Sequence, residues 1–476
     1  MKSSLAKNAA FNVLYNVLNV VFPLFSASYL ARVLAPEGIG RVSYAQNIVS
    51  YFVMFAALGI PGYGTREIAR LKNSTDETNK LFSELFLINF ISTSVCVAAY
   101  YLVISLFFRE HILLYAIFGL ELFFNYINID WFYRGREEYA YIAVRSILIK
   151  IISLGLLVLF VRTREDYIAY ALISCLAIGG NYFFNVFHAR RSVSLVFRGL
   201  ELHRHLSPVL ILMLSSVMAS LYCKVDTTML GAISTEEAVG FYSNAHKVVN
   251  IVLTLATAIT AVFLPRLSYV YKNEQENYGK YLSKGFEIVF FLVLPCWIGL
   301  ILVADELAFV LFGAAFAPAA ETIRILAMLI AIKGIGDLLC YQAIISSGKE
   351  RYLVNSRIVA GVTNVILNAI LIPRYSYNGA AIASVISELV VNGAMLPYAL
   401  SECRLKVSGR FVWTTVLATI LMAVLVTAVR GMLNGEVVSL ILSVLTGILV
   451  YVTVAAVLGN EMIRMVISSV KKDRSV

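Results

Sequence analysis

The sequence predicts an all-α integral membrane protein with about 14 transmembrane helices. Three observations predict this class. Hydrophobic residues make up 60% of the 476 residues and charged residues only 14%, whereas soluble domains carry about 25% charged residues. The apolar residues gather in runs of roughly 20, the length at which a helix crosses a bilayer. Lysine and arginine concentrate in alternate connections, as in multi-pass membrane proteins.

The apolar segments follow one another with short connections. The first begins after Lys2 and Lys7 and is too long for a signal-peptide core, so we expect it to be retained as a helix. The fourteen segments lie near residues 9–35, 40–63, 80–106, 112–133, 141–161, 167–188, 207–232, 239–264, 282–304, 318–345, 352–373, 379–401, 411–430 and 437–458.

The basic residues predict that both termini face the cytoplasm. Connections on the side of the N-terminus hold about 26 lysines and arginines, and those on the other side about 7. The remaining six cations lie within apolar segments: Arg145, Lys150, Lys224, Lys247, Arg324 and Lys333.

The sequence contains no signature of an enzyme. It has no GxxxxGK[ST] loop, no HExxH or GxSxG motif, no paired CxxC and no large connection that could hold an extramembrane domain. We therefore predict no catalytic residues, no cofactor and no metal site. The net charge of +10 depends on its location in a membrane protein, and we predict no nucleic-acid partner.

An internal repeat divides the chain. GRVSYAQNIV (40–49) matches GFYSNAHKVV (240–249) at four positions, and a shift of about 213 aligns GREEY (135–139) with GKERY (348–352). Repeats with an even number of helices are related by an axis along the membrane normal. We expect an N-terminal six-helix lobe at 1–188, a cytoplasmic amphipathic connector at 189–206, a C-terminal six-helix lobe at 207–403, and two further helices with a cytoplasmic tail at 404–476.

Several stretches together resemble a known family. They are NAAFNVLYNVLNVVFPLFSASYLARVLAPEGIGRVSYAQNIVSYF at the start, KVDTTMLG in the seventh segment, then VGFYSNAHKVVNIV and FLPRLS, with LGIPGYGTREIAR and SSGKERY elsewhere. Over nearly the whole chain they resemble the Wzx-like polysaccharide flippases of the multidrug/oligosaccharidyl-lipid/polysaccharide exporter superfamily.

The resemblance implies two six-helix lobes around a cavity that opens alternately to either side of a prokaryotic cytoplasmic membrane. It implies a cargo of undecaprenyl- or other polyprenyl-pyrophosphate bearing an oligosaccharide. Membrane lipids, a polysaccharide polymerase and assembly proteins are the implied partners. Lipid II flippases are distant relatives with a YYADR stretch. Where they have arginine and aspartate, SNAHKV has Lys247 and His246, which argues against lipid II as the cargo.

Charged residues within the apolar segments form the candidate site. A charge at the bilayer centre costs at least about 2.5–3.5 kcal/mol, so it normally faces protein or water. Lys224 and Asp226 lie about 200° apart around an ideal helix and cannot face one another. We interpret Lys224 as a cavity cation and Asp226 as a coupling or orienting residue. The other candidate cavity cations are Arg32, Lys247, Arg145, Lys150 and Lys333, and the other coupling or orienting candidates are Asp130, His246, Asp337 and Glu388.

Two other interpretations of these charges stay open. They could form internal ion pairs that hold helices together, and Lys333 and Asp337 have the four-residue spacing of a helical ion pair. Arg145 and Lys150 could extend their charges to the membrane surface.

A pyrophosphate cargo would need such cations. An isolated ion in a low-dielectric medium costs tens of kcal/mol, and lysine or arginine replaces its hydration with charge-assisted hydrogen bonds. The energy source stays open among protons, sodium and the membrane potential. A cation-coupled multidrug exporter, a lipid II-type flippase and a membrane scaffold for polysaccharide assembly are the alternative functions.

Overall fold

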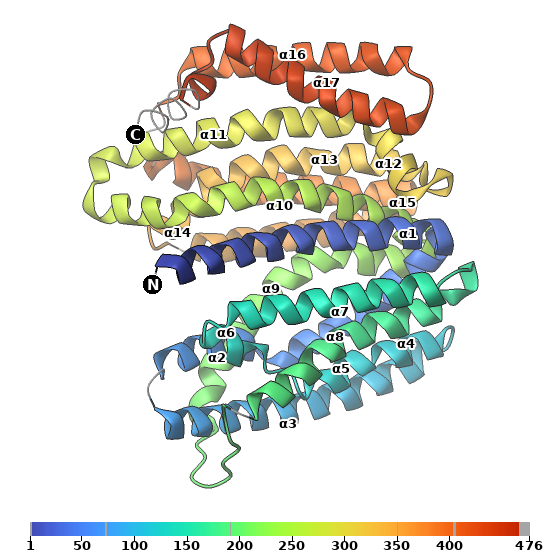
Figure 1. Ribbon diagram of the computed structural model, residues 1–476, viewed down its shortest axis with the longest axis vertical. Helices are drawn as coiled ribbons and strands as arrows, with labels where there is room; N and C mark the ends of the chain where they lie inside the picture. Colours follow the sequence, from blue (N-terminus) through green and yellow to red (C-terminus); the bar gives the residue numbers. More distant parts are fainter. Residues whose placement is uncertain (1, 72–73, 191, 350, 403–405, 466–476) are drawn as a thin grey trace. The chain divides into compact units, whose positions relative to one another are not determined.

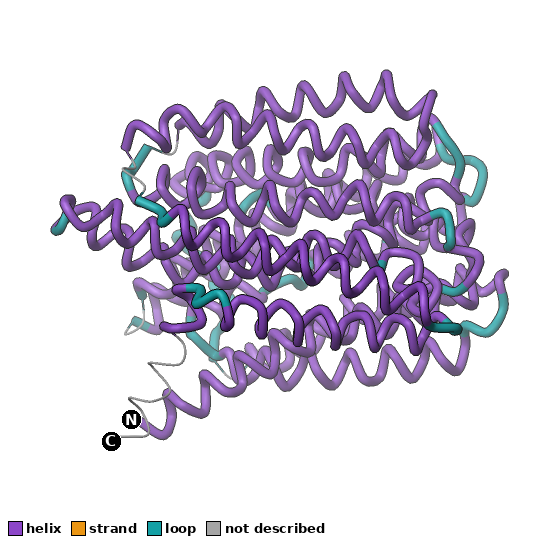
Figure 2. The backbone as a smooth tube through the Cα atoms, turned by 90° about the horizontal axis from the view of Figure 1, so that it is seen from above, coloured by secondary structure: helices purple, strands orange, loops and turns teal. Residues whose placement is uncertain are grey.

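The expected all-helical fold is confirmed. The computed structural model describes residues 2–71, 74–190, 192–349, 351–402 and 406–465. In these ranges the chain forms helices joined by short loops, without a β-strand (Figure 2). Each apolar segment falls on one helix or a run of short helices. Eight of the described helices are long and apolar enough to cross a membrane. The predicted cytoplasmic tail beyond residue 465 lies outside the described residues.

The chain divides into two compact units. The first comprises 1–231 and 235–240, and the second 232–234 and 241–476. The boundary differs from the expected one at 207, because the seventh segment lies in the first unit as helix α9 (His203–Ile233).

The first unit is built around α1 (Lys2–Ala57), which packs on α3 and α7. Its buried cores are rich in aromatic side chains, among them Trp131, Phe132 and Tyr100. The other helices of this unit are α2 (Ile60–Arg70), α3 (Thr75–Phe107), α4 (Ile112–Phe118), α5 (Leu120–Asn125), α6 (Asp130–Gly135), α7 (Tyr139–Phe160), α8 (Tyr167–Ala189) and α9, with a 3₁₀ turn η1 (Arg164–Asp166).

The second unit contains α11 packed on both α13 and α16, and α16 packed on α17 (Figure 1). Exposed apolar side chains such as Trp413 and Leu449 cover the outer faces of α16 and α17, as expected for helices in lipid. The elements are α10 (Glu236–Asn273), α11 (Gln275–Leu302), α12 (Ala304–Phe312), η2 (Ala314–Phe316), α13 (Ala319–Gly336), the π-helical turn η3 (Asp337–Gln342), α14 (Ala343–Ser346), α15 (Arg351–Glu402), α16 (Gly409–Met432) and α17 (Glu436–Val457).

Two of the long helices are interrupted where the sequence predicts a boundary between segments. In α1, Ala35 has φ 58° and ψ 177° directly before Pro36. Proline disfavours helical geometry in the residue before it and removes a backbone donor. In α15, Ser376 has φ 48° and ψ −129° and separates the eleventh and twelfth segments.

A pair of glycines from the internal repeat forms one backbone crossing within the first unit. A Cβ on Gly40 of α1 would overlap the carbonyl oxygen of Glu236, and a Cβ on Gly240 would overlap that of Pro36. Pro36 and Glu236 are themselves 200 residues apart, so the two contacts exchange equivalent residues. Arg41 pairs with the Glu236 carboxylate beside the crossing. Only glycine allows backbones to approach this closely.

The connector does not form the expected amphipathic helix. Residue 190 and residues 192–202 are non-helical. Some of their backbone N–H groups donate hydrogen bonds to side chains of α3. Ser194 donates to Asn79 Oδ1 at 2.9 Å, and Val196 donates to Ser83 Oγ at 2.8 Å. These side chains give the non-helical segment partners for some of its backbone donors.

We predict that Gly40→Ala and Gly240→Ala each lower the thermal unfolding temperature in detergent by several degrees. The added methyl group overlaps a backbone carbonyl, and such overpacking costs about 1–3 kcal/mol. Unfolding is followed by size-exclusion chromatography after heating.

Gly155→Ala is the matched control, because a Cβ at Gly155 meets nothing within 4 Å and alanine favours helix. If the Gly40→Ala protein unfolds at the same temperature as the wild type, the tight crossing is contradicted.

Candidate functional site

The segment around Lys224 and Asp226 lies against α1 in the first unit. Lys224 is half-buried and Asp226 is buried. Asn47 donates to the backbone carbonyl of Lys224 at 3.2 Å and to Thr228 Oγ1 at 2.7 Å. The Tyr51 hydroxyl lies 2.7 Å from the same Thr228 oxygen. These bonds fix the register of α9 on α1 and thereby set where the two charges stand.

A further acid close to Lys224 is Glu121 of α5. Its side chain is 8% exposed, and within the described part of the chain its Oε1 has no hydrogen-bond partner. The positive charge of Lys224 acts on this carboxyl group. Sequence reasoning missed Glu121, although an acid in the fourth apolar segment is the signal that could have found it. Lys224 of α9 and Glu121 of α5 therefore interact electrostatically, and the buried Asp226 stands two residues further along α9.

Asp130 and Arg145 meet in a second group. Arg145 of α7 is buried, and its Nη1 lies 3.2 Å from Asp130 Oδ1 at the start of α6. Arg145 also donates to Asn181 and Asn185 of α8. This network joins α6, α7 and α8, and it neutralises the arginine within the unit. Lys150 lies half-buried further along α7.

In the second unit, Lys333 and Glu388 are brought together. Lys333 Nζ of α13 lies 3.3 Å from Glu388 Oε2 of α15. Asp337, which has helical spacing to Lys333, instead accepts hydrogen bonds from Thr260 and Gln342. Asp337 begins the π-helical turn η3, and such turns occur frequently at functional sites.

The remaining candidates stand on α10 and α1. On α10, Lys247 Nζ donates to Asn244 Oδ1 at 3.3 Å, and His246 stacks on Tyr242 with ring centroids 5.7 Å apart. Arg32 is exposed on α1, three residues before the break. The candidates thus divide between the units, with Arg32, Asp130, Arg145, Lys150, Lys224 and Asp226 in the first and His246, Lys247, Lys333, Asp337 and Glu388 in the second.

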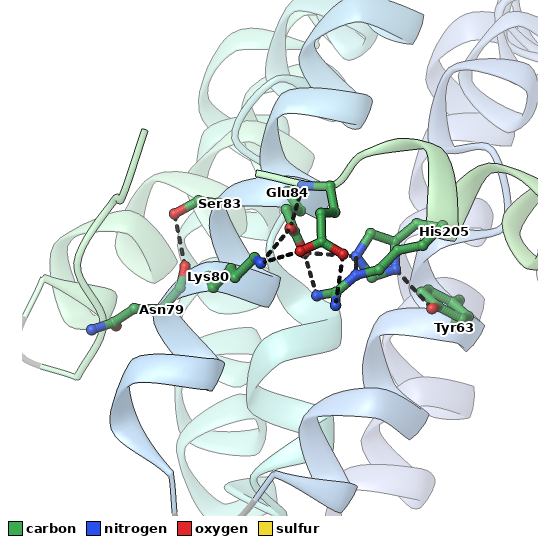
Figure 3. Close-up of polar contacts among 8 residues, drawn as sticks. Tyr63, Asn79, Lys80, Ser83, Glu84 and His205 are labelled. Atoms are coloured by element: carbon green, nitrogen blue, oxygen red, sulfur yellow. Dashed lines mark hydrogen bonds and ion pairs between the residues drawn. The ribbon is translucent and has the colours of Figure 1, made fainter. Parts of the chain in front are cut away.

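A further polar network was not predicted from the sequence. Glu84 of α3 is fully buried and receives Arg204 Nη2 at 2.8 Å and His205 Nε2 at 2.7 Å (Figure 3). The other nitrogen of His205, Nδ1, lies 2.8 Å from the Tyr63 hydroxyl. The backbone N–H of Glu201 also donates to Glu84, at 2.7 Å. One carboxylate thus binds both the end of the connector and the start of α9.

Lys80 completes this network at its exposed edge. Its Nζ lies 2.9 Å from Glu201 Oε1 and 4.0 Å from Glu84 Oε1. The ammonium lowers the pKa of the Glu201 carboxyl, chiefly through their hydrogen bond. Among the residues that the structure describes, no three histidine, cysteine or acidic side chains converge as metal ligands.

The sequence is similar to known polysaccharide proteins. The family model described as polysaccharide biosynthesis protein matches residues 5–270. The chain is 23% identical to the putative O-antigen transporter of Escherichia coli K12 over 83% of this chain and 97% of that protein. It is 26% identical to the probable low-salt glycan biosynthesis flippase Agl15 of Haloferax volcanii, over 50% of this chain and 51% of that protein.

The fold is similar to that of solved transporters. The lipid II flippase MurJ in an inward closed conformation superposes with a TM-score of 0.76 at 14% identity, covering 96% of this chain and all of MurJ. An inward-facing multidrug resistance MATE transporter of the MOP superfamily superposes with a TM-score of 0.61 at 16% identity, covering 80% of this chain and 93% of that one.

We predict that Glu84→Gln destabilises the protein by about 1–3 kcal/mol, because it removes the buried carboxylate that receives Arg204 and His205. The thermal unfolding temperature falls, and trypsin cleaves the connector at Arg198 faster than in the wild type. Asp76→Asn in the exposed first turn of α3 is the control. An unchanged cleavage rate in Glu84→Gln would show that the connector is held by other contacts.

Proposed function

Because the chain belongs to the polysaccharide biosynthesis protein family, we propose that it is a flippase for polyprenyl-pyrophosphate-linked oligosaccharides in a prokaryotic cytoplasmic membrane. The observation that carries this proposal is Lys224, a half-buried cation whose charge acts on the buried Glu121 carboxyl within a bundle of apolar helices. The relatives named as an O-antigen transporter and a glycan flippase support it.

The chemistry of the cargo explains why a lysine is needed at this depth. The pyrophosphate carries about two negative charges, and moving them bare through hydrocarbon is prohibitive. Lys224 offers a compact cation with three donors, which can bind a phosphate oxygen. The polyprenyl tail needs no such help, because it is already soluble in the bilayer. Flipping therefore requires binding and release but no covalent step.

The neighbouring acids give the site a means of release. With the cargo absent, Glu121 offsets the charge of Lys224, and Asp226 stands two residues further along α9, so the empty site carries no large uncompensated cation. Binding of the diphosphate to Lys224 replaces the interaction of this lysine with the neighbouring acid. We infer that the cargo crosses by alternating access, and that protons, sodium ions or the membrane potential act through these two acids.

Arg145 has a different role in this proposal. Its ion pair with Asp130 and its bonds to Asn181 and Asn185 already satisfy its donors. Removing one partner of such a buried network is costly. We therefore assign Arg145 and Asp130 to holding α6, α7 and α8 together, and Lys224 to the cargo.

We predict that cells lacking the gene lose surface polysaccharide, and that the wild-type gene restores it. Lys224→Gln restores roughly 10- to 100-fold less, because a charge-assisted hydrogen bond contributes about 1.5–3 kcal/mol. Polysaccharide is measured on whole cells, and lipid-linked oligosaccharide in membrane extracts, where it accumulates.

Lys272→Gln is the control, since Lys272 is an exposed lysine in the last turn of α10. Normal polysaccharide together with raised drug sensitivity in the deletion strain would favour a multidrug exporter instead. Accumulation of lipid II would favour a lipid II-type flippase. Full export by Lys224→Gln would leave the membrane scaffold as the better explanation.

A further inference from the structure

A pocket of about 830 Å³ lies in the second unit, where α10 ends and α11 begins. Residues from four helix ends contribute to it: the end of α10, the start of α11, the chain before α16 and the chain after α17. Its charged lining residues are Lys280, Lys284, Lys406, Glu276, Glu287 and Glu461. The pocket thus combines three cations and three anions.

The helix α11 presents its charges toward this pocket in one row. Lys280, Lys284 and Glu287 have the spacing i, i+4, i+7, which places them on one helix face. The backbone N–H of Lys406 donates to Ser283 Oγ at 2.8 Å and so fixes the chain before α16 against this face. The row runs from exposed lysines to a carboxylate that is only 8% exposed.

These charges are not paired with one another. Within the described part of the chain, no ion pair within 4.0 Å is found for the six, and Lys284, one turn earlier on α11, acts on the Glu287 carboxyl only through its charge. Elsewhere in the same unit, buried Glu306 is paired with Arg430. Burying a carboxylate without a partner costs several kcal/mol. A ligand that brings its own cation to Glu287 would remove this cost.

The first unit has a serine in the position that matches Ser283, and there the chain itself supplies cationic partners to the neighbouring acid. Ser83 and Ser283 are 200 residues apart. The hydroxyl of each donates to the backbone carbonyl four residues earlier. Each hydroxyl also accepts a hydrogen bond from a backbone N–H, of Val196 in the first unit and of Lys406 in the second. Beside Ser83, the acid Glu84 receives Arg204 and His205. Beside Ser283, the position that matches Glu84 is Lys284, and the acid Glu287 stands one turn further along α11.

We propose that this pocket binds the phosphoethanolamine headgroup of a membrane lipid. The phosphate binds the lysines at the rim, and the ammonium binds Glu287 with support from Glu461. This headgroup carries a phosphate and an ammonium in one molecule, which complements the lysines and the glutamate on one face of α11. The exposed Trp413 near the start of α16 marks the depth at which aromatic side chains meet lipid headgroups. The proposal is independent of the identity of the cargo.

The test titrates the purified full-length protein in detergent with phosphatidylethanolamine, phosphatidylglycerol and phosphatidylcholine, and follows binding by native mass spectrometry. Phosphatidylethanolamine should bind about tenfold more tightly than phosphatidylglycerol, which lacks the ammonium. Phosphatidylcholine should bind weakly, because its quaternary ammonium has no N–H to donate. Equal binding of phosphatidylethanolamine and phosphatidylglycerol to the wild type would overturn the proposal.

Variants separate the two ends of the headgroup. Glu287→Gln should abolish the preference for phosphatidylethanolamine, whereas Lys280→Gln should weaken binding of both phosphatidylethanolamine and phosphatidylglycerol. Glu461→Gln, at an exposed position, provides a milder loss of preference if Glu287→Gln fails to fold. Glu436→Gln and Lys272→Gln, outside the pocket, should bind as the wild type does. A preference that survives both glutamate substitutions would overturn the proposal.

Discussion

The need to compensate ions within an apolar bundle shapes both units of this protein. Charge removed from water costs several kcal/mol unless partners replace the lost hydration. Glu84 meets this constraint with Arg204 and His205, and Arg145 meets it with Asp130 and two asparagines. Such groups also join helices that are distant in sequence. Where compensation from the chain is incomplete, as at Glu287, a pocket adjoins the charge.

This constraint separates structural charges from functional ones. Arg145 and Lys224 both lie within apolar segments, and their sequence context alone does not distinguish them. The arginine is surrounded by acceptors from α6 and α8, so its charge holds three helices together. The lysine stands on a helix whose hydrogen bonds to Asn47 involve its backbone and a neighbouring threonine. In the proposed function, the site for an anionic cargo thus consists of few residues, supported by polar contacts that do not touch the cargo.

The fold was largely predictable, because a helix that spans a bilayer needs a run of about 20 apolar residues, which is visible in the sequence. Proline and the end of an apolar run located the break in α1. Partners of the buried charges were less predictable, since they depend on tertiary packing. Lys333 pairs with Glu388, 55 positions away, while Asp337, at the ideal helical spacing, accepts hydrogen bonds from Thr260 and Gln342. The connector looked amphipathic, yet side chains of α3 hold it extended. Glu121 and Glu84 were overlooked beside the more conspicuous lysines.

The crossing of Gly40 and Gly240 has a consequence for the history of the chain. If the two halves descend from one duplicated segment, most positions became free to diverge once each copy had its own surroundings. Here each copy supplies the surface against which the other rests. A larger residue at either glycine would clash with the backbone of the other half. Both positions should therefore stay glycine while the surrounding sequences diverge.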